Sequence, residues 1–245
     1  MKLAVFLLAG GGIRLKPYTN DIPKCLVEVN GKKLLIRMLD YLAKGGIEKV
    51  ILVIGYKGKI IRSTVGDSWN GMGIVYIDNK DWATTNNVVS LNLAVPLIND
   101  DFILLEGDLI FTWEAFNPLF KPDRMAVDNY QKYMDGTLVD IDKNQNVTRF
   151  LMNKDLSEDE KIDFYKTVNL YSFKYDSFKS LILPQLNDLI KSGQKQVYYE
   201  QAIANAVILS DYNTTAVNFS GTPWYEIDTE DDLYKAEELF RETNI

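Results

Sequence analysis

Two patterns of hydrophobic and polar positions alternate along the first half of the chain. Apolar, β-branched runs of the kind that form buried strands lie at residues 3–8, 50–54, 74–77 and 102–105. Between these runs, apolar residues recur every three or four positions, which predicts helices near residues 34–42, 59–65 and 87–95. Strands that alternate with helices predict an α/β fold with a doubly wound, mostly parallel, Rossmann-like sheet.

The alternation of strands and helices ends after Phe111. Shorter strands are predicted at residues 125–129, 137–141, 147–152, 167–173, 215–219 and 225–227, with a hairpin turn at 142–146. Helices are predicted near residues 178–191 and 198–209, and a last helix begins at Thr229 with capping-box spacing to Asp232. The 245 residues therefore predict a single domain, with a core of residues 1–111 and 212–245 and an inserted α+β lobe of residues 112–211.

The amino-acid composition argues against several functional classes. The 34 acidic residues outnumber the 27 basic ones and give a net charge of −7, which argues against nucleic-acid or anionic-membrane partners. A single cysteine, Cys25, and the lack of a membrane-spanning apolar stretch favour a cytoplasmic protein. The chain has no histidine, so any catalysis must use carboxylates, lysines and a hard metal ion.

A glycine-rich segment follows the first predicted strand and carries several cations nearby. It contains Gly10, Gly11 and Gly12, followed by Arg14, Lys16 and Lys24. Glycines let backbone N–H groups turn toward an anion, and the cations would neutralise phosphate oxygens. Two plainer readings remain: a tight turn after an edge strand, or the apolar part of a secretion signal.

Two aspartates stand at predicted strand ends. Asp108 follows the run LLEG, and Asp228 ends the stretch YEID immediately before the last helix. Ligands collect beyond the carboxyl ends of strands in open α/β sheets, and paired carboxylates suit Mg²⁺. The plain alternatives are a surface carboxylate for Asp108 and a helix-capping acid for Asp228.

The segment LLAGGGIRLKP with the later PKCL resembles the signature LAAGxGxRLxP...PK of the sugar-phosphate nucleotidyltransferase superfamily, which has a GT-A-like fold. Leu8 departs from the usual alanine. The resemblance implies that Leu8, Ala9, the three glycines and Lys16 surround a nucleoside triphosphate. It further implies that Arg14 contacts the β and γ phosphates, that Lys24 approaches the α or acceptor phosphate, and that Asp108 and Asp228 bind Mg²⁺.

Later stretches are similar to cytidylyltransferases that activate phosphocholine, 2-aminoethylphosphonate or phosphoglutamine. They are NNVVSL, MDGTLV, YKTVNLYSF, YYEQ and WYEIDTEDDLYKAEELF. The resemblance implies CTP as substrate, a CDP-linked product used in capsule or cell-surface modification, and pyrophosphate release, and it leaves room for a homodimer. Asn86, Asn87 and Ser90 are the candidate nucleotide-binding residues of this region, although one asparagine could simply cap the helix.

The acceptor would be a small phosphorylated amine. Lys166 is the candidate for its phosphate, unless it is a solvent-facing strand lysine. An amine needs anionic or aromatic surroundings, for which the candidates are Asp135, Glu200, Tyr198 and Trp224, with Glu106 and Tyr199 also available.

The missing histidine fits this reaction. A phosphate monoester dianion is already deprotonated at neutral pH, so its attack on the α-phosphorus needs positioning and charge neutralisation rather than a general base. Three alternatives remain open: a sugar-1-phosphate nucleotidyltransferase using UTP, dTTP or CTP, a glycosyltransferase using Asp140 and Asp142 as a DxD motif, and a non-catalytic nucleotide-binding subunit.

Overall fold

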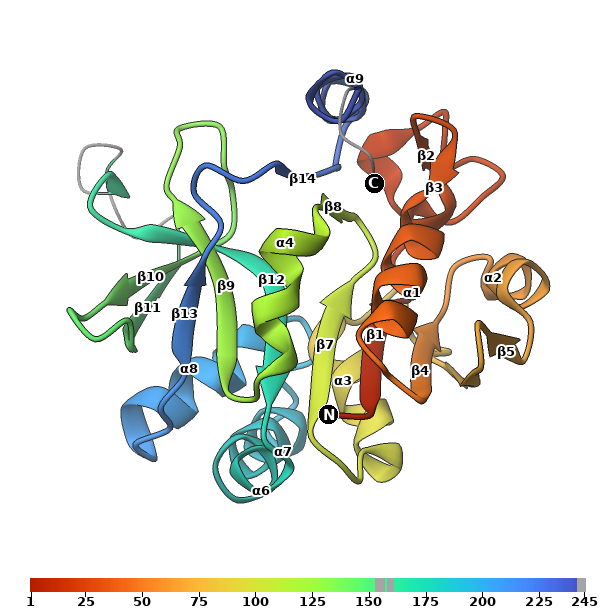
Figure 1. The fold of residues 1–245 in the computed structure, drawn as a ribbon. Helices are drawn as coiled ribbons and strands as arrows, with labels where there is room; N and C mark the ends of the chain where they lie inside the picture. Colours follow the sequence, from red (N-terminus) through yellow and green to blue (C-terminus); the bar gives the residue numbers. More distant parts are fainter. Residues whose placement is uncertain (153–156, 158–160, 242–245) are drawn as a thin grey trace.

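The computed structural model describes residues 1–152, 157 and 161–241. At its centre lies β1 (Leu3–Leu8), which pairs in parallel with β4 (Lys49–Ile54) on one side and β7 (Phe102–Glu106) on the other. The next strand outward is β6 (Met72–Asp78), parallel to β4. The order β6-β4-β1-β7 confirms the predicted parallel core, and Figure 1 shows β7, β1 and β4 side by side from its centre to the right. Residues 3–8 are therefore a central buried strand, as the strand reading predicted.

Both faces of the sheet are covered, as the sequence pattern predicts. Alternate residues of β1 face opposite ways: Phe6 belongs to one buried cluster and Val5 to the other. The first cluster is covered by α1 (Leu34–Lys44) and α2 (Gly58–Val65). The second is covered by α3 (Asn87–Ala94), α7 (Leu183–Lys191) and α8 (Glu200–Leu209), below and behind the sheet in Figure 1.

The strands of the second half extend the same sheet. The long strand β12 (Tyr165–Phe173) is antiparallel to β7, β9 (Arg124–Asn129) and β10 (Thr137–Ile141). Beyond them lie β11 (Val147–Met152), joined to β10 by the predicted hairpin, and β13 (Thr215–Asn218), parallel to β9. Because β12 bonds directly to β7, these strands form one ten-stranded sheet with the parallel core. The division into core and lobe stays a prediction.

A two-stranded ribbon lies beyond the sheet. It pairs β8 (Leu109–Phe111) with β14 (Trp224–Glu226), which is one residue earlier than the predicted strand at 225–227. The Ile227 N–H donates to the Asp108 carbonyl at 2.9 Å, so segments 119 residues apart in sequence lie side by side at the ribbon. The final helix α9 (Glu230–Leu239) has the predicted capping box between Thr229 and Asp232.

The helix predicted over residues 178–191 is interrupted. Its first part is a π-helical turn at Phe178–Ile182, and α7 begins only at Leu183, with Pro184 in its first turn. The remaining short elements are β2 (Glu28–Val29), β3 (Lys32–Lys33), β5 (Ser68–Trp69), α4 (Trp113–Phe116) and α6 (Tyr175–Ser177). Among the described residues, no helix is both long and apolar enough to cross a membrane.

Candidate active site

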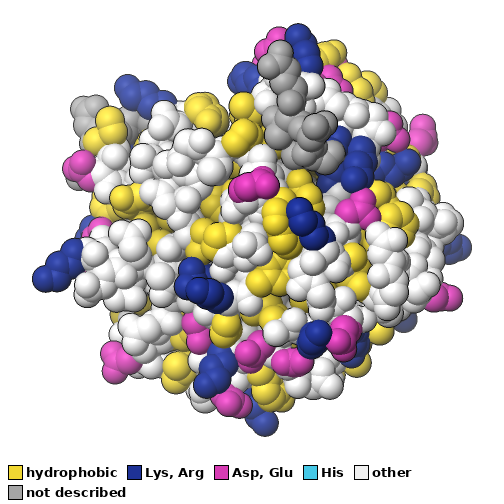
Figure 2. Space-filling model, in the orientation of Figure 1, with side chains coloured by type: hydrophobic (Ala, Val, Ile, Leu, Met, Phe, Trp, Pro, Cys, Tyr) yellow, Lys and Arg dark blue, Asp and Glu magenta, His cyan; other side chains and the backbone are white. Residues whose placement is uncertain are grey.

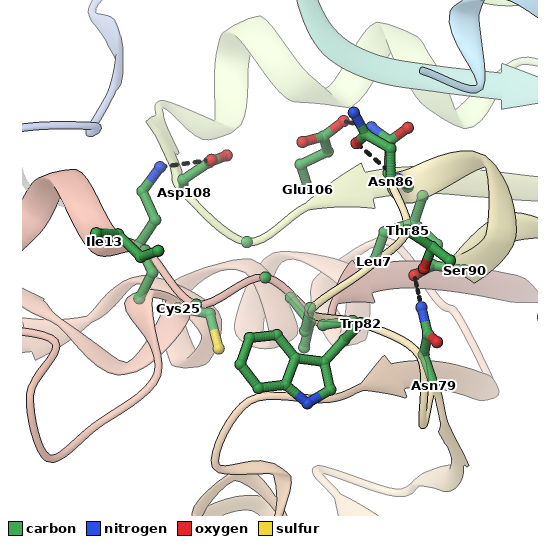
Figure 3. Close-up of a pocket in the computed structure, with 18 of the residues that line it drawn as sticks. Leu7, Ile13, Cys25, Asn79, Trp82, Thr85, Asn86, Ser90, Glu106 and Asp108 are labelled. Atoms are coloured by element: carbon green, nitrogen blue, oxygen red, sulfur yellow. Dashed lines mark hydrogen bonds and ion pairs between the residues drawn. The ribbon is translucent and has the colours of Figure 1, made fainter. Parts of the chain in front are cut away.

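A cavity of about 420 Å³ opens at the carboxyl ends of β1 and β7. These strands are neighbours in the sheet but far apart in sequence, which makes this the topological switch point where open α/β sheets bind ligands. Figure 3 shows Glu106 and Asp108 on one side of the cavity and the Trp82 ring on another. The predicted catalytic and nucleotide-binding residues that line it are Leu8, Ala9, Gly10, Gly11, Gly12, Arg14, Lys24, Asn86, Asn87, Ser90, Asp108 and Asp228. Tyr198 and Glu106, which were candidates for the acceptor amine, line this cavity and not the second one.

Gly12 has a local reason to be glycine. Its φ is +58°, in the left-handed region, and it precedes a 3₁₀ turn at Ile13–Leu15. A Cβ there would lie 3.0 Å from the Lys24 Cβ and 3.2 Å from the Thr19 Cγ2. The Thr19 hydroxyl donates to the Gly12 carbonyl at 2.8 Å. The loop therefore packs directly on the stem of Lys24, so its conformation and the position of that lysine are coupled.

The four predicted catalytic residues form one ion-pair network. The Lys24 Nζ lies 2.8 Å from the Asp108 Oδ2 and 2.6 Å from the Asp228 Oδ1, and the Arg14 guanidinium lies 2.8 Å from the Asp228 Oδ2. Burial alone would raise the pKa of Asp228, but Lys24 and Arg14 outweigh burial and lower it. Burial would lower the pKa of Lys24, but Asp108 and Asp228 raise it. Lys24 and Asp228 are therefore charged at neutral pH.

The two aspartates have the chemistry that Mg²⁺ requires. The Asp108 Oδ1 is buried and has no hydrogen-bond partner among the described residues. A buried carboxylate oxygen without a partner is costly unless a ligand satisfies it. Within residues 1–152, 157 and 161–241, no group of three or more Asp, Glu, His or Cys side chains is arranged to hold a metal. Proteins usually bind Mg²⁺ through one or two carboxylates plus substrate phosphates.

The two asparagines predicted to read the base are engaged in other contacts. Asn86 caps α3, since its Oδ1 accepts from the Asn87 N–H at 2.7 Å. The Asn87 side chain donates to Glu106 at 3.2 Å and accepts from the Tyr199 N–H at 2.9 Å. The Ser90 hydroxyl accepts from Asn79 at 3.0 Å, as Figure 3 shows, and keeps its own proton to donate. The helix-capping alternative therefore holds for Asn86.

A second cavity of about 240 Å³ adjoins the first and shares Arg14 and Asp228 with it. Lys166 lines it, 1% exposed, with its Nζ 3.5 Å from the Glu226 Oε2. Lys166 is therefore not the solvent-facing lysine of the alternative reading. The other lining residues are Tyr133, Met134, Asp135, Trp224, Tyr225, Thr229 and Asp232.

Aromatic side chains shape this second cavity. The rings of Tyr133 and Tyr225 stack with 6.3 Å between centroids and 5° between planes. The Trp224 Nε1 donates to the Asp128 Oδ2 at 2.6 Å, which fixes the indole. The cavity thus combines a buried cation with anionic and aromatic groups, the features expected for a phosphorylated amine.

Some predicted residues lie elsewhere. Lys16 is exposed and lines neither cavity. Glu200 is 4% exposed and lies in the core behind the site rather than in a cavity wall. Asp142 belongs to the β10–β11 turn, where its Oδ1 accepts from the N–H groups of Asn144 and Asn146 at 2.8 Å, so it has a structural role.

Trp82 and Glu226 were missed by the sequence reasoning. Trp82 packs on the glycine loop, because a Cβ at Gly11 would lie 3.3 Å from its ring. Nothing in its neighbouring residues signals this contact. Glu226 lies within the stretch YEID, and its place two residues before Asp228 was the available signal.

Burial raises the pKa of Glu200 to about 7, and its Oε2 has no partner among the described residues. Between its ordinary pKa of 4.5 and this value, the folded protein holds a proton that the unfolded chain has released. The free energy of unfolding therefore falls as pH rises through this range. We expect Glu200→Gln to remove this fall.

Thermal unfolding from pH 4 to pH 8 tests this expectation. As pH rises, the Tm of Glu200→Gln should increase relative to the Tm of wild type. The control Glu238→Gln, at an exposed position, should have the wild-type pH dependence throughout. A Glu200→Gln variant with the wild-type pH dependence would contradict the assignment.

The fold is an open α/β sheet with two adjoining cavities at the edge where such sheets bind ligands. The nucleotidyl transferase family model matches residues 3–243, and the chain belongs to this family. The resemblance inferred from the glycine-rich signature is thereby confirmed.

Individual relatives differ in their reactions. CMP-5'-(3-aminopropyl)phosphonate synthase of Streptomyces rubellomurinus is 30% identical over 97% of this chain, which spans 38% of that relative. UTP–glucose-1-phosphate uridylyltransferase of Haloferax volcanii is 40% identical over 44% of this chain and 44% of its own. The chain thus matches less than half the length of either. The solved CTP:phosphocholine cytidylyltransferase of Streptococcus pneumoniae has a TM-score of 0.79 at 20% identity, over 98% of this chain and 100% of its own. This similarity confirms the fold class.

Proposed function

We propose that this protein transfers CMP from CTP to a small phosphorylated or phosphonate amine and releases pyrophosphate. The observation that carries the proposal is the meeting of two cavities at Arg14 and Asp228, with Lys24 joining Asp228 to Asp108 at the same point. The cytidylyltransferase and aminopropylphosphonate names among the relatives support CTP and an amine-bearing acceptor.

The residues present fit an in-line displacement. A phosphate or phosphonate oxygen of the acceptor forms a bond to the α-phosphorus while the bond to the bridging oxygen breaks, and pyrophosphate leaves with that electron pair. Glycine-loop N–H groups and Arg14 hold the triphosphate, and Lys24 neutralises charge between the two cavities. Asp108 and Asp228 would hold Mg²⁺, which would offset the negative charge of the transferring phosphate.

Lys166 would bind the acceptor phosphate in the second cavity. We expect Lys166→Met to raise the KM for the acceptor at least about tenfold, because a buried charge-assisted contact is lost. The KM for CTP should change much less. Steady-state kinetics with each substrate varied in turn measures this split, and Lys143→Met, in the exposed hairpin turn, is the control. Equal changes in both KM values would contradict an acceptor-side role.

Pyrophosphate release tests the proposed reaction. The protein and Mg²⁺ are mixed with CTP, UTP, dTTP or GTP and with phosphocholine, 2-aminoethylphosphonate, phosphoglutamine or a hexose 1-phosphate. We expect turnover with CTP and one of the amines. Turnover only with UTP or dTTP and a hexose 1-phosphate would favour the sugar-1-phosphate alternative, which the Haloferax relative supports.

Three narrower statements from the sequence stay predictions. They are a cytoplasmic location, a homodimer, and use of the product in capsule or cell-surface modification. Figure 2 shows basic and acidic side chains interspersed over much of the face that it draws.

A further inference from the structure

Lys24 fills the space between the two carboxylates that would hold the metal ion. Its Nζ lies within 2.8 Å of an oxygen from each, Asp108 Oδ2 and Asp228 Oδ1. The Arg14 guanidinium occupies the remaining oxygen of Asp228. Three of the four carboxylate oxygens are therefore ion-paired with cations of the protein, and only the Asp108 Oδ1 has no partner among the described residues.

The two cations hold the carboxylates with unequal strength. The Arg14 side chain is 65% exposed, and an exposed ion pair is weak and easily exchanged. The Lys24 side chain is 14% exposed and its two partners are 16% and 24% exposed, so this bridge is screened far less by water. Lys24 is therefore the main obstacle to a cation that binds both aspartates.

The formal charges of these four groups balance without a ligand. Arg14 and Lys24 carry two positive charges, and Asp108 and Asp228 carry two negative ones. If a divalent cation bound alone, the two carboxylates would lose their contacts with the Lys24 ammonium, and the site would carry an excess of positive charge. A triphosphate brings negative charge that attracts the lysine away from the carboxylates and offsets the incoming metal.

The nucleotide cavity offers the Lys24 ammonium a second position. Its stem packs against Gly12 of the phosphate loop, and its side chain lines the nucleotide cavity. A change in its outer torsions alone can move the ammonium from the carboxylates toward a phosphate in that cavity.

We propose that Lys24 closes the metal site in the nucleotide-free protein and opens it when the nucleotide phosphates bind, so that metal and nucleotide enter together. This positioning role rests on the proposed function only in taking Asp108 and Asp228 as metal ligands. It predicts that the free protein binds divalent cations weakly because of Lys24.

Mn²⁺ binding without nucleotide or acceptor tests the proposal, with free Mn²⁺ measured by electron paramagnetic resonance. We expect Lys24→Met and Lys24→Gln to bind Mn²⁺ at least tenfold more tightly than wild type, and Lys57→Met, whose lysine pairs with the exposed Asp21, to match wild type. Adding Asp108→Asn to Lys24→Met should abolish the gain. Equal Mn²⁺ affinity in wild type and in both Lys24 variants would overturn the proposal.

Anomalous diffraction from wild-type crystals gives a second test that needs no substitution. Crystals soaked in MnCl₂ alone should show no peak between Asp108 and Asp228, and crystals with Mn²⁺ and CTP should show one, with Lys24 moved to a phosphate. A peak between the aspartates without nucleotide would contradict the proposal. Because the Mn²⁺ titration contains no substrate, it can succeed even if the pyrophosphate assay rejects CTP or the amine acceptors.

Discussion

Replacing Asp108 or Asp228 by Asn should lower turnover roughly 10³-fold, the scale expected when several kcal/mol of charge stabilisation is lost. Each variant keeps the shape of the side chain but removes a charged ligand for the metal and a partner of Lys24. The loss should appear in kcat at saturating Mg²⁺, because the interaction is needed when charge builds on the transferring phosphate.

The measurement requires proof that the variants fold. Circular dichroism and thermal unfolding should resemble wild type, since one carboxylate still pairs with Lys24 in each variant. Asp67→Asn, at an exposed position outside both cavities, should keep full activity. Near-normal turnover of either Asp108→Asn or Asp228→Asn would remove that residue from the metal site.

Substituting Gly12 should have the next largest effect. In Gly12→Ala the new Cβ would lie 3.0 Å from the Lys24 Cβ, so the loop or the lysine must shift. Misplacement of a positioning group by about 1 Å can cost about 100-fold in rate. We expect a loss of roughly that size in kcat/KM for CTP.

Gly46→Ala is the matched control. Gly46 has a φ of +79°, close in kind to that of Gly12, but its Cβ would meet nothing within 4 Å and it lies after α1, outside both cavities. Both variants should lose about 1 kcal/mol of stability from left-handed strain. Only Gly12→Ala should lose activity, and equal activity of the two would show that the contact with Lys24 is unimportant.

The features that the sequence predicted correctly are set by local patterns. The central strand at residues 3–8 and helix α1 follow from apolar periodicity, and the glycine loop and Asp108 follow from short motifs next to a strand. The capping box at Thr229 is likewise local, because its partner lies three residues away. Each of these could be predicted because neighbouring residues carry the whole signal.

The features that escaped prediction depend on distant contacts. Lys24 meets carboxylates 84 and 204 residues away, so their shared ammonium could not be inferred from spacing. Asn87 lines the nucleotide cavity as predicted, but its contacts with Glu106 and the backbone of Tyr199 could not be inferred from spacing. Glu200 was a candidate for the acceptor amine, whereas packing of α8 on the sheet buries it outside both cavities. Tertiary packing decided each case.

The central claim is that nucleotide and acceptor occupy the two cavities and react where these meet. A crystal structure with a nonhydrolysable CTP analogue, Mg²⁺ and the acceptor found by the pyrophosphate assay tests it most directly. We expect the triphosphate against Gly10, Gly11 and Gly12, the acceptor phosphate beside Lys166, and the α-phosphorus between them near Asp108 and Asp228. An acceptor bound outside the second cavity, or a triphosphate away from the glycine loop, would contradict the account.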